Sequence, residues 1–200
     1  MSILSAPLTF TPRRGADRQS SSLLTVAVKK ATKKNEILGG LHLIEQVFPG
    51  AQTTNDFYML RTFKSEWACF IATSSRRRIV AVTLLKSGND ARLGPYADVT
   101  RPRLDSFGVD AEVRSRGVGK QLLHGVLSWS VREWKSTSCS LEVSKRNHSA
   151  YKLYWQFGFR PTEQRGGLYI PMEVKGLQEP DYGKFLSEMR FNRSHFLRSL

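Results

Sequence analysis

Two closely spaced glycines and three basic side chains form the segment of the chain best suited to bind phosphate. Gly117 and Gly119 are accompanied by Arg114, Arg116 and Lys120. A strand-like run ends shortly before them and a long amphipathic pattern follows, so they stand where a helix begins. The first N–H groups of a helix lack partners within it and attract phosphate, and glycine admits phosphate close to the backbone. A Gly-x-Gly alone also fits a tight turn, but this context favours a phosphate site.

Other side chains with catalytic chemistry are sparse. His124 lies in a helical pattern and His148 at a helix start, where histidines are usually surface residues, although either has the chemistry of a general base. The only cysteines, Cys69 and Cys139, each lie in an apolar run. Buried thiols of this kind are typical of a reduced compartment, so we expect a cytoplasmic location. No spacing of His, Cys, Asp and Glu matches a metal site, and we expect no metal.

The hydrophobic pattern predicts a mixed α/β domain that would position these residues. Apolar and β-branched runs predict strands, and apolar residues at helical spacing predict helices. The predicted strands are 23–28, 67–73, 79–85, 104–109, 139–143, 159–164 and 168–174. The predicted helices are 37–48, 56–63, a long one from Gly119 to Trp134, and 150–157; the pair Gly39-Gly40 weakens the first and is a possible break. This order, without an internal repeat, predicts an α/β fold with a mixed sheet.

Composition divides the chain into a central domain, residues 23–177, and two tails. Residues 1–22 are rich in Ser, Pro and Arg, which indicates a flexible tail, with a transit peptide as the alternative. Residues 178–200 are basic, with apolar side chains at roughly helical spacing. They predict a helix that packs on the domain or on a second copy in a homodimer, or else a segment for a membrane surface or acidic partner. No apolar run approaches the roughly 20 residues of a membrane span.

The chain is strongly basic. Its 200 residues include 31 Lys+Arg against 17 Asp+Glu, a net charge of +14. This charge attracts polyanions in general, and RNA or a phosphate-rich cofactor in particular. A cationic small-molecule substrate would be repelled unless the cleft itself is acidic, and Asp105, Glu112 and Glu142 are the candidates for making it so.

Two motifs resemble the GNAT family of N-acetyltransferases. Arg114-x-x-Gly117-x-Gly119, after a strand ending at Val109, is similar to the family signature Gln/Arg-x-x-Gly-x-Gly/Ala. The block from Leu141 to Phe159 is similar to a later family motif, a strand followed by a helix that ends in Tyr-x-x-x-Gly-Phe. The resemblance covers residues 23–174 in element order. It implies a central twisted mixed sheet flanked by helices, in which splayed strands at 104–109 and 140–143 form a coenzyme A wedge.

The resemblance implies acetyl-CoA as the co-substrate. The pantetheine arm would pair with the backbone around Phe107, Gly108 and Val109, where an N–H group would polarise the thioester carbonyl. Asn147 would contact the cofactor and also cap its own helix. The pyrophosphate would lie on the segment made of Arg114, Ser115, Arg116, Gly117, Val118, Gly119 and Lys120.

The resemblance also implies catalytic roles. By spacing alone Tyr154 fits a core tyrosine, but the family motif makes it the acid that protonates the departing thiolate. Glu142 lies between two apolar strand residues, so its side chain points to the opposite face and is a candidate base. The spacing of Glu142, Asn147 and Tyr154 resembles the subfamily that acetylates protein N-termini, including those of ribosomal proteins. Asp105 on the adjacent strand, or a base acting through water, is the alternative.

The expected function is an acetyl-CoA-dependent N-acetyltransferase that moves an acetyl group to a primary amine by direct attack. The expected acceptor is a protein amine, either an N-terminus or a lysine. The short turn at Arg165-Gly166-Gly167 departs from the N-terminal subfamily, because it leaves little chain to cover a peptide. The alternatives are an RNA-directed acetyltransferase of the kind that acetylates aminoacyl-tRNA, a small-molecule amine acetyltransferase, and a non-enzymatic acyl-CoA-binding module.

Overall fold

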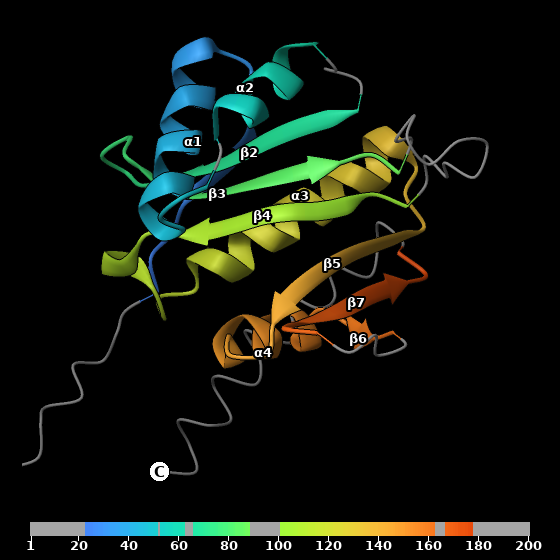
Figure 1. Cartoon of the computed structure of the whole chain (residues 1–200). Helices are drawn as coiled ribbons and strands as arrows, with labels where there is room; N and C mark the ends of the chain where they lie inside the picture. The colour runs from blue at the N-terminus through green and yellow to red at the C-terminus, as the bar shows by residue number, and fades with distance from the viewer. Residues whose placement is uncertain (1–22, 52, 63–65, 89–100, 163–166, 178–200) are drawn as a thin grey trace, which may run out of the picture.

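The computed structural model describes residues 23–51, 53–62, 66–88, 101–162 and 167–177. Within these ranges the chain forms one seven-stranded sheet with helices on both faces (Figure 1). The strands are β1 (Ala27–Lys30), β2 (Trp67–Thr73), β3 (Ile79–Lys86), β4 (Arg103–Val109), β5 (Ser138–Ser144), β6 (Arg160–Pro161) and β7 (Tyr169–Lys175). The helices are α1 (Lys34–Val47), α2 (Thr53–Thr62), the 3₁₀ turn η2 (Ala111–Val113), α3 (Val118–Trp134) and α4 (His148–Gln156).

The strands follow the order β1-β2-β3-β4-β5-β7-β6 across the sheet. Every neighbouring pair is antiparallel except β4 and β5, which are parallel. A parallel pair needs a crossover connection, and α3 supplies it. The predicted α/β class with a mixed sheet is confirmed.

The central strands are buried on both faces because a different helix layer covers each face. On β2, Phe70 and Ala72 belong to the core beneath α3. Cys69 and Ile71 of the same strand pack with Leu41 of α1 on the other face. Burial on both sides explains why β2 and β3 read as continuous apolar runs rather than as alternating ones.

The glycine pair in α1 does not break the helix, which runs from Lys34 to Val47. A Cβ added to Gly40 would lie 3.1 Å from Cγ2 of Val82 and 3.2 Å from Cγ2 of Ile71. The absent side chain therefore lets α1 lie close on the sheet. This close packing offsets the roughly 1 kcal/mol that a glycine costs in a helix interior.

The first strand begins later than the pattern predicts, at Ala27 rather than at residue 23. The preceding residues bind α3 instead of β2. The Leu24 N–H donates to the Arg116 carbonyl at 3.0 Å, and the Gln121 side chain donates to the Leu24 carbonyl at 2.7 Å. Gln121 also accepts from the Val26 N–H at 3.2 Å. The segment is extended as predicted, but its partner is a helix.

The predicted tails, 1–22 and 178–200, lie outside the described residues, as do residues 163–166 of the last turn. On the first side of the final hairpin, Arg160 and Pro161 pair with β7, and residues 163–164 of the strand predicted there are not among the described residues. The helix predicted at 56–63 begins earlier, at Thr53. Among the described helices, none is long and apolar enough to cross a membrane.

Candidate active site

β4 and β5 pair at one end and then separate, as Figure 1 shows. Their pairing joins Arg103 to Ser140 and Leu104 to Leu141. Among the described residues no further pair joins these strands, so the backbone at 107–109 is left open on its β5 side. The splayed strands that the family resemblance implies are therefore present.

The separation begins at a β-bulge in β4. Against β3, Leu104 pairs with Leu85, whereas the next pair joins Ser106 to Leu84. Asp105 is therefore an extra residue on β4. A bulge bends its strand and increases the local twist, which turns the rest of β4 away from β5.

A cavity of about 590 Å³ opens where the strands part. Its walls come from the end of α1, the end of β4, the first turn of α3 with the loop before it, and α4. It is lined by Val47, Phe48, Phe107, Val109, Val113, Arg114, Ser115, Gly117, Val118, Gly119, Lys120, Asn147, Ser149, Ala150 and Leu153. The lining includes every residue predicted to contact the cofactor except Gly108 and Arg116. Gly108 faces α1 instead, where an added Cβ would lie 3.5 Å from Val47.

The first turn of α3 presents free backbone N–H groups to this cavity. Gly117 is the N-cap residue, with φ of +80°, and no side chain caps the helix. Ser115 also has a positive φ, +62°, which the sequence did not reveal. The Nε of Arg114 donates to the Val109 carbonyl at 3.0 Å and ties the loop to the end of β4. Uncapped N–H groups at a helix start form an anion site, so this turn is arranged for phosphate.

Gly119 marks the narrow part of the cavity. A Cβ added there would lie 3.4 Å from Cδ2 of Leu153, 3.6 Å from Cγ2 of Val109 and 3.7 Å from Cε1 of Phe107. These are ordinary van der Waals distances, so a methyl group fits but a longer side chain would occupy the cavity. The glycine thus keeps the space between β4, α3 and α4 open.

Arg78 is a residue of this region that the sequence interpretation missed. Its Nη2 contacts carboxylate oxygens of both Asp110 and Glu112, each at 2.8 Å. The second oxygen of Asp110 accepts from the Glu112 N–H at 2.9 Å. The arginine partly neutralises two acidic groups immediately before the loop that leads into α3. The sequence shows Arg78 only as part of a basic turn, because its partners lie more than thirty residues away.

Asn147 lines the cavity and caps α4 at once. Its side-chain oxygen accepts from the Ala150 N–H at 3.1 Å, the ordinary role of an N-cap residue. The side-chain amide nitrogen makes no hydrogen bond within the described part of the chain. Both roles predicted for Asn147 are therefore geometrically compatible.

Tyr154 lies in the core next to the cavity, not on its lining. Its ring packs edge to face with Phe107, with centroids 6.0 Å apart, and with Phe159, with centroids 5.8 Å apart. Burial raises the pKa of the Tyr154 hydroxyl, so it stays protonated at neutral pH. Within the described residues the hydroxyl has no hydrogen-bond partner. The structure thus places a protonated donor behind Phe107, which itself lines the cavity.

The two candidate bases lie on the opposite face of the sheet from Tyr154. Leu141 and Val143 belong to the core beneath α3, so Glu142 between them points the other way. Its carboxylate lies 3.4 Å from Nη2 of Arg103, and both side chains are half exposed. Asp105, at the bulge, is exposed on the α2 side. Burial, and secondly the charge of Asp105, raises the pKa of Asp56 in α2, which places these two carboxyl groups near each other.

The remaining reactive side chains do not line the cavity. Burial raises the pKa of the Cys69 and Cys139 thiols to about 12, so both are neutral packing residues. His148 is exposed at the start of α4. Among the described residues, no group of three or more His, Cys, Asp and Glu side chains is placed to hold a metal ion.

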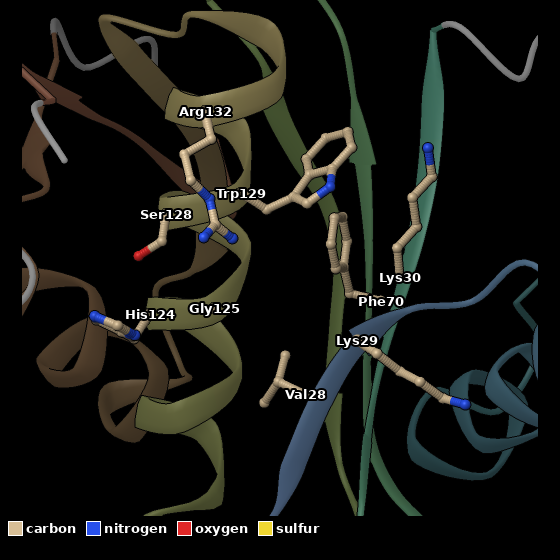
Figure 2. A pocket seen from close by; sticks show the side chains of 9 residues that line it. All are labelled: Val28, Lys29, Lys30, Phe70, His124, Gly125, Ser128, Trp129 and Arg132. Atoms are coloured by element: carbon tan, nitrogen blue, oxygen red, sulfur yellow. The ribbon is translucent and has the colours of Figure 1, made fainter.

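A second cavity, of about 390 Å³, lies at the other edge of the sheet between β1 and α3 (Figure 2). The Lys30 amine lies 4.8 Å from the centroid of the Trp129 ring, which packs edge to face on Phe70 at 5.0 Å. Lys29 turns away toward α1, where it pairs with Glu36 at 2.6 Å. His124 also lines this cavity. Among the described residues that line it, none belongs to β4, β5 or the first turn of α3, so it lacks the helix start and the open strand of the first cavity.

Comparisons with known proteins agree with this geometry. The sequence model of the acetyltransferase (GNAT) family matches residues 23–159. No curated protein matches the chain. Among solved structures, the ribosomal-protein-S18-alanine N-acetyltransferase from Escherichia coli superposes with a TM-score of 0.61 at 15% identity, over 77% of this chain and 96% of that one.

Two further solved structures that superpose on this chain are also N-acetyltransferases. The PaiA N-acetyltransferase from Thermoplasma acidophilum, in complex with coenzyme A, has a TM-score of 0.56 at 14% identity, over 76% of this chain and 99% of that one. A spermidine N-acetyltransferase chimera from Vibrio cholerae and hSSAT has a TM-score of 0.59 at 14% identity, over 80% and 98%. These identities show a common fold and leave the acceptor open. The match of the family model over most of the chain shows more: this protein belongs to the GNAT family and is an acetyl-CoA-dependent acetyltransferase.

Proposed function

We propose that the chain transfers the acetyl group of acetyl-CoA to a primary amine of a protein, an N-terminus or a lysine, by direct attack of the amine on the thioester. The observation that carries the proposal is the cavity at the parting of β4 and β5. It brings together an uncapped helix start, an open strand backbone and, behind Phe107, a protonated tyrosine. These are the groups needed to hold an acyl-CoA and to stabilise its leaving thiolate.

The donor side of the cavity fits an acyl-CoA. The N–H groups of Val118, Gly119 and Lys120 are free for the pyrophosphate, and the side chain of Arg114 closes the loop beside them. The open backbone at 107–109 offers hydrogen-bonding groups to an extended pantetheine arm, as a neighbouring strand would. A backbone N–H at this edge would polarise the thioester carbonyl.

Tyr154 would supply the proton that the sulfur takes as the carbon–sulfur bond breaks. Its raised pKa keeps the hydroxyl protonated before the reaction. Its position behind Phe107 requires that the thioester lie at the inner end of the cavity, beside that ring.

The acceptor would approach from the other face, where Glu142 and Asp105 lie. An amine is a nucleophile only after it loses a proton, and either carboxylate could take it, directly or through water. Donor and acceptor would thus meet at the gap between the strands from opposite faces of the sheet. The contact of Glu142 with Arg103 restricts the orientation of this carboxylate, and we take Glu142 as the preferred base.

A small cationic amine is the second candidate acceptor. The specific observation is that the carboxyl groups of Asp56 and Asp105 lie near each other on this face, since neighbouring carboxyl groups favour a cation between them. The acceptor face therefore brings together carboxyl groups, those of Asp56, Asp105 and Glu142, in a basic protein. A lysine side chain and a polyamine share this chemistry, so the structure favours a cationic amine of either kind.

One transfer experiment separates these acceptors. Radiolabelled acetyl-CoA and the purified chain are added to a cell lysate, which is then fractionated into protein, RNA and small molecules. We expect label in the protein fraction, and its loss with Tyr154→Phe. Label confined to small molecules would show that the acceptor is a small amine and not a protein. Label in RNA would refute both the protein acceptor and the small-amine acceptor.

A further inference from the structure

α4 has two faces with different surroundings. Ala150 and Leu153 line the donor cavity. On the opposite side Tyr151, Lys152 and Trp155 border a shallow hollow of about 350 Å³ that opens to solvent. The proposed transfer reaction uses only the first face, so the second needs a separate explanation.

Trp155 forms an exposed aromatic platform on the second face. The side chain is 44% exposed, and the Arg160 guanidinium carbon lies 4.1 Å from the ring centroid. Nη1 of Arg160 donates to the carbonyls of Trp155 and Phe159, at 3.0 and 2.9 Å, which holds the guanidinium against the ring. The Tyr151 ring lies 5.9 Å away and tilted by 31°. The Nε and Nη2 groups of Arg160 make no hydrogen bond within the described structure and remain available to a ligand.

Four basic side chains lie in the sequence around this platform, between Glu142 and Glu163. Residues 143–162 contain Lys145, Arg146, Lys152 and Arg160 and no Asp or Glu. All four are exposed, and in the part of the chain that the structure describes none pairs with a carboxylate. They are distributed over α4, which is about 13 Å long, and the turns at its two ends. The helix and the turns at its ends therefore combine an exposed aromatic ring with four basic side chains that no described carboxylate pairs with.

We propose that this face, defined by Lys145, Arg146, Lys152, Trp155 and Arg160, binds single-stranded RNA. Phosphates would contact the lysines and Arg146, and a base would stack on Trp155. Positive charge interleaved with exposed aromatic rings is how proteins bind single strands without sequence preference. Unstacked bases suited to such a platform are displayed mainly by RNA loops and ends.

RNA fits this face better than the other polyanions. An acidic peptide matches the charge but has no flat partner for the indole. Insertion of Trp155 into a membrane would need its ring to project from the surface, whereas Arg160 holds the ring against the protein and more than half of this residue is covered. The inference does not depend on which amine is acetylated.

The test is fluorescence anisotropy of a labelled mixed-sequence RNA of about 12 nucleotides, within the site size of single-strand binders. The full chain is used with saturating coenzyme A, so that the donor cavity cannot bind the phosphates. Trp155→Ala is expected to weaken binding roughly tenfold or more, with Trp155→Phe in between. Lys152→Glu is expected to lower the slope of log affinity against log salt by about 0.7 or more. The matched control is Lys34→Glu, the same charge change at the exposed start of α1, expected to change affinity less than about twofold because salt screens distant charges.

Calorimetric binding of acetyl-CoA by the same variants separates this proposal from the proposed function. It is expected to stay unchanged, which also shows that the variants fold. RNA binding that Trp155→Ala does not weaken would overturn the proposal, as would no RNA binding at low salt. Preferential binding of vesicles of anionic lipid, or of a Glu-rich peptide, would assign the face to another partner and overturn it too.

Discussion

Replacing Gly119 with glutamate is expected to weaken the binding of acetyl-CoA without destabilising the fold. Gly119 is the second residue of α3 and has no positive φ, so a side chain there causes no backbone strain. A Cβ meets only ordinary contacts, the nearest at 3.4 Å. Removing a glycine from a helix gains up to about 1 kcal/mol, and an acidic group in the first turn adds roughly 0.3–1 kcal/mol through the helix dipole. The free energy of unfolding of Gly119→Glu is therefore expected to equal or exceed that of the wild type.

Donor affinity is expected to change in the opposite direction. The added carboxylate would enter the cavity beside the N–H groups proposed to hold the pyrophosphate. At about 5 Å and an effective dielectric constant of about 20, two like charges repel by about 3 kcal/mol. This corresponds to a loss of acetyl-CoA affinity of about a hundredfold, since each 1.4 kcal/mol is a factor of ten.

Calorimetric titration with acetyl-CoA measures the affinity, and urea unfolding measures the stability. Gly119→Gln is the matched control, because it has nearly the same shape without the charge. We expect glutamine to weaken binding less than glutamate, and the difference to shrink at high salt. Equal losses in both variants would show that the effect is steric, and wild-type affinity in Gly119→Glu would mean that the phosphates lie elsewhere.

Three other changes probe the catalytic acid, the loop and the acceptor face. Tyr154→Phe is expected to lower kcat with little change in the acetyl-CoA dissociation constant, and unchanged turnover would remove Tyr154 from the mechanism. Arg78→Ala leaves Asp110 and Glu112 without this cation, just before the loop proposed to bind phosphate, so acetyl-CoA affinity is expected to fall several-fold at low salt. Because Arg78 and Glu112 are largely exposed, stability should change by less than about 1 kcal/mol. The raised pKa of Asp56 means that the folded state holds this proton more tightly than the unfolded state. The free energy of unfolding is therefore expected to fall as pH rises from about 4, the unfolded pKa, through the higher folded pKa. Asp56→Asn should reduce this fall, which urea unfolding at several pH values measures. If the free energy of unfolding depends on pH in the same way in the variant and the wild type, the raised pKa of Asp56 is refuted.

Local patterns predicted most of the elements that form the donor site. The glycines at 117 and 119 follow a strand and precede an amphipathic helix, and the structure has the same order, with α3 starting at Val118. β2 begins and ends at the same residues as its apolar run. A strand that is buried on both faces is apolar throughout, so its ends can be seen in the sequence. The expected contacts of these residues with acetyl-CoA remain predictions.

The errors arose where a residue depends on a distant partner. The first strand was placed too early because the side chain of Gln121, almost one hundred residues away, takes up the backbone groups of residues 24–26. The sequence did not reveal the role of Arg78, because this residue precedes β3 whereas its two carboxylate partners follow β4. Periodicity reports which face of an element is buried, but not which element covers it.

The sequence by itself determined the class of fold, the family and the place of the glycine-bearing turn before α3, because strand and helix periodicity and glycine spacing are local properties. The tertiary structure alone decided that β4 departs from β5 after two residue pairs, since this follows from the register of β4 against β3 and the bulge at Asp105. It also placed Tyr154 and the carboxylates of Asp105 and Glu142 on opposite faces of the gap. That separation depends on how three strands and two helices pack together, which no single segment encodes.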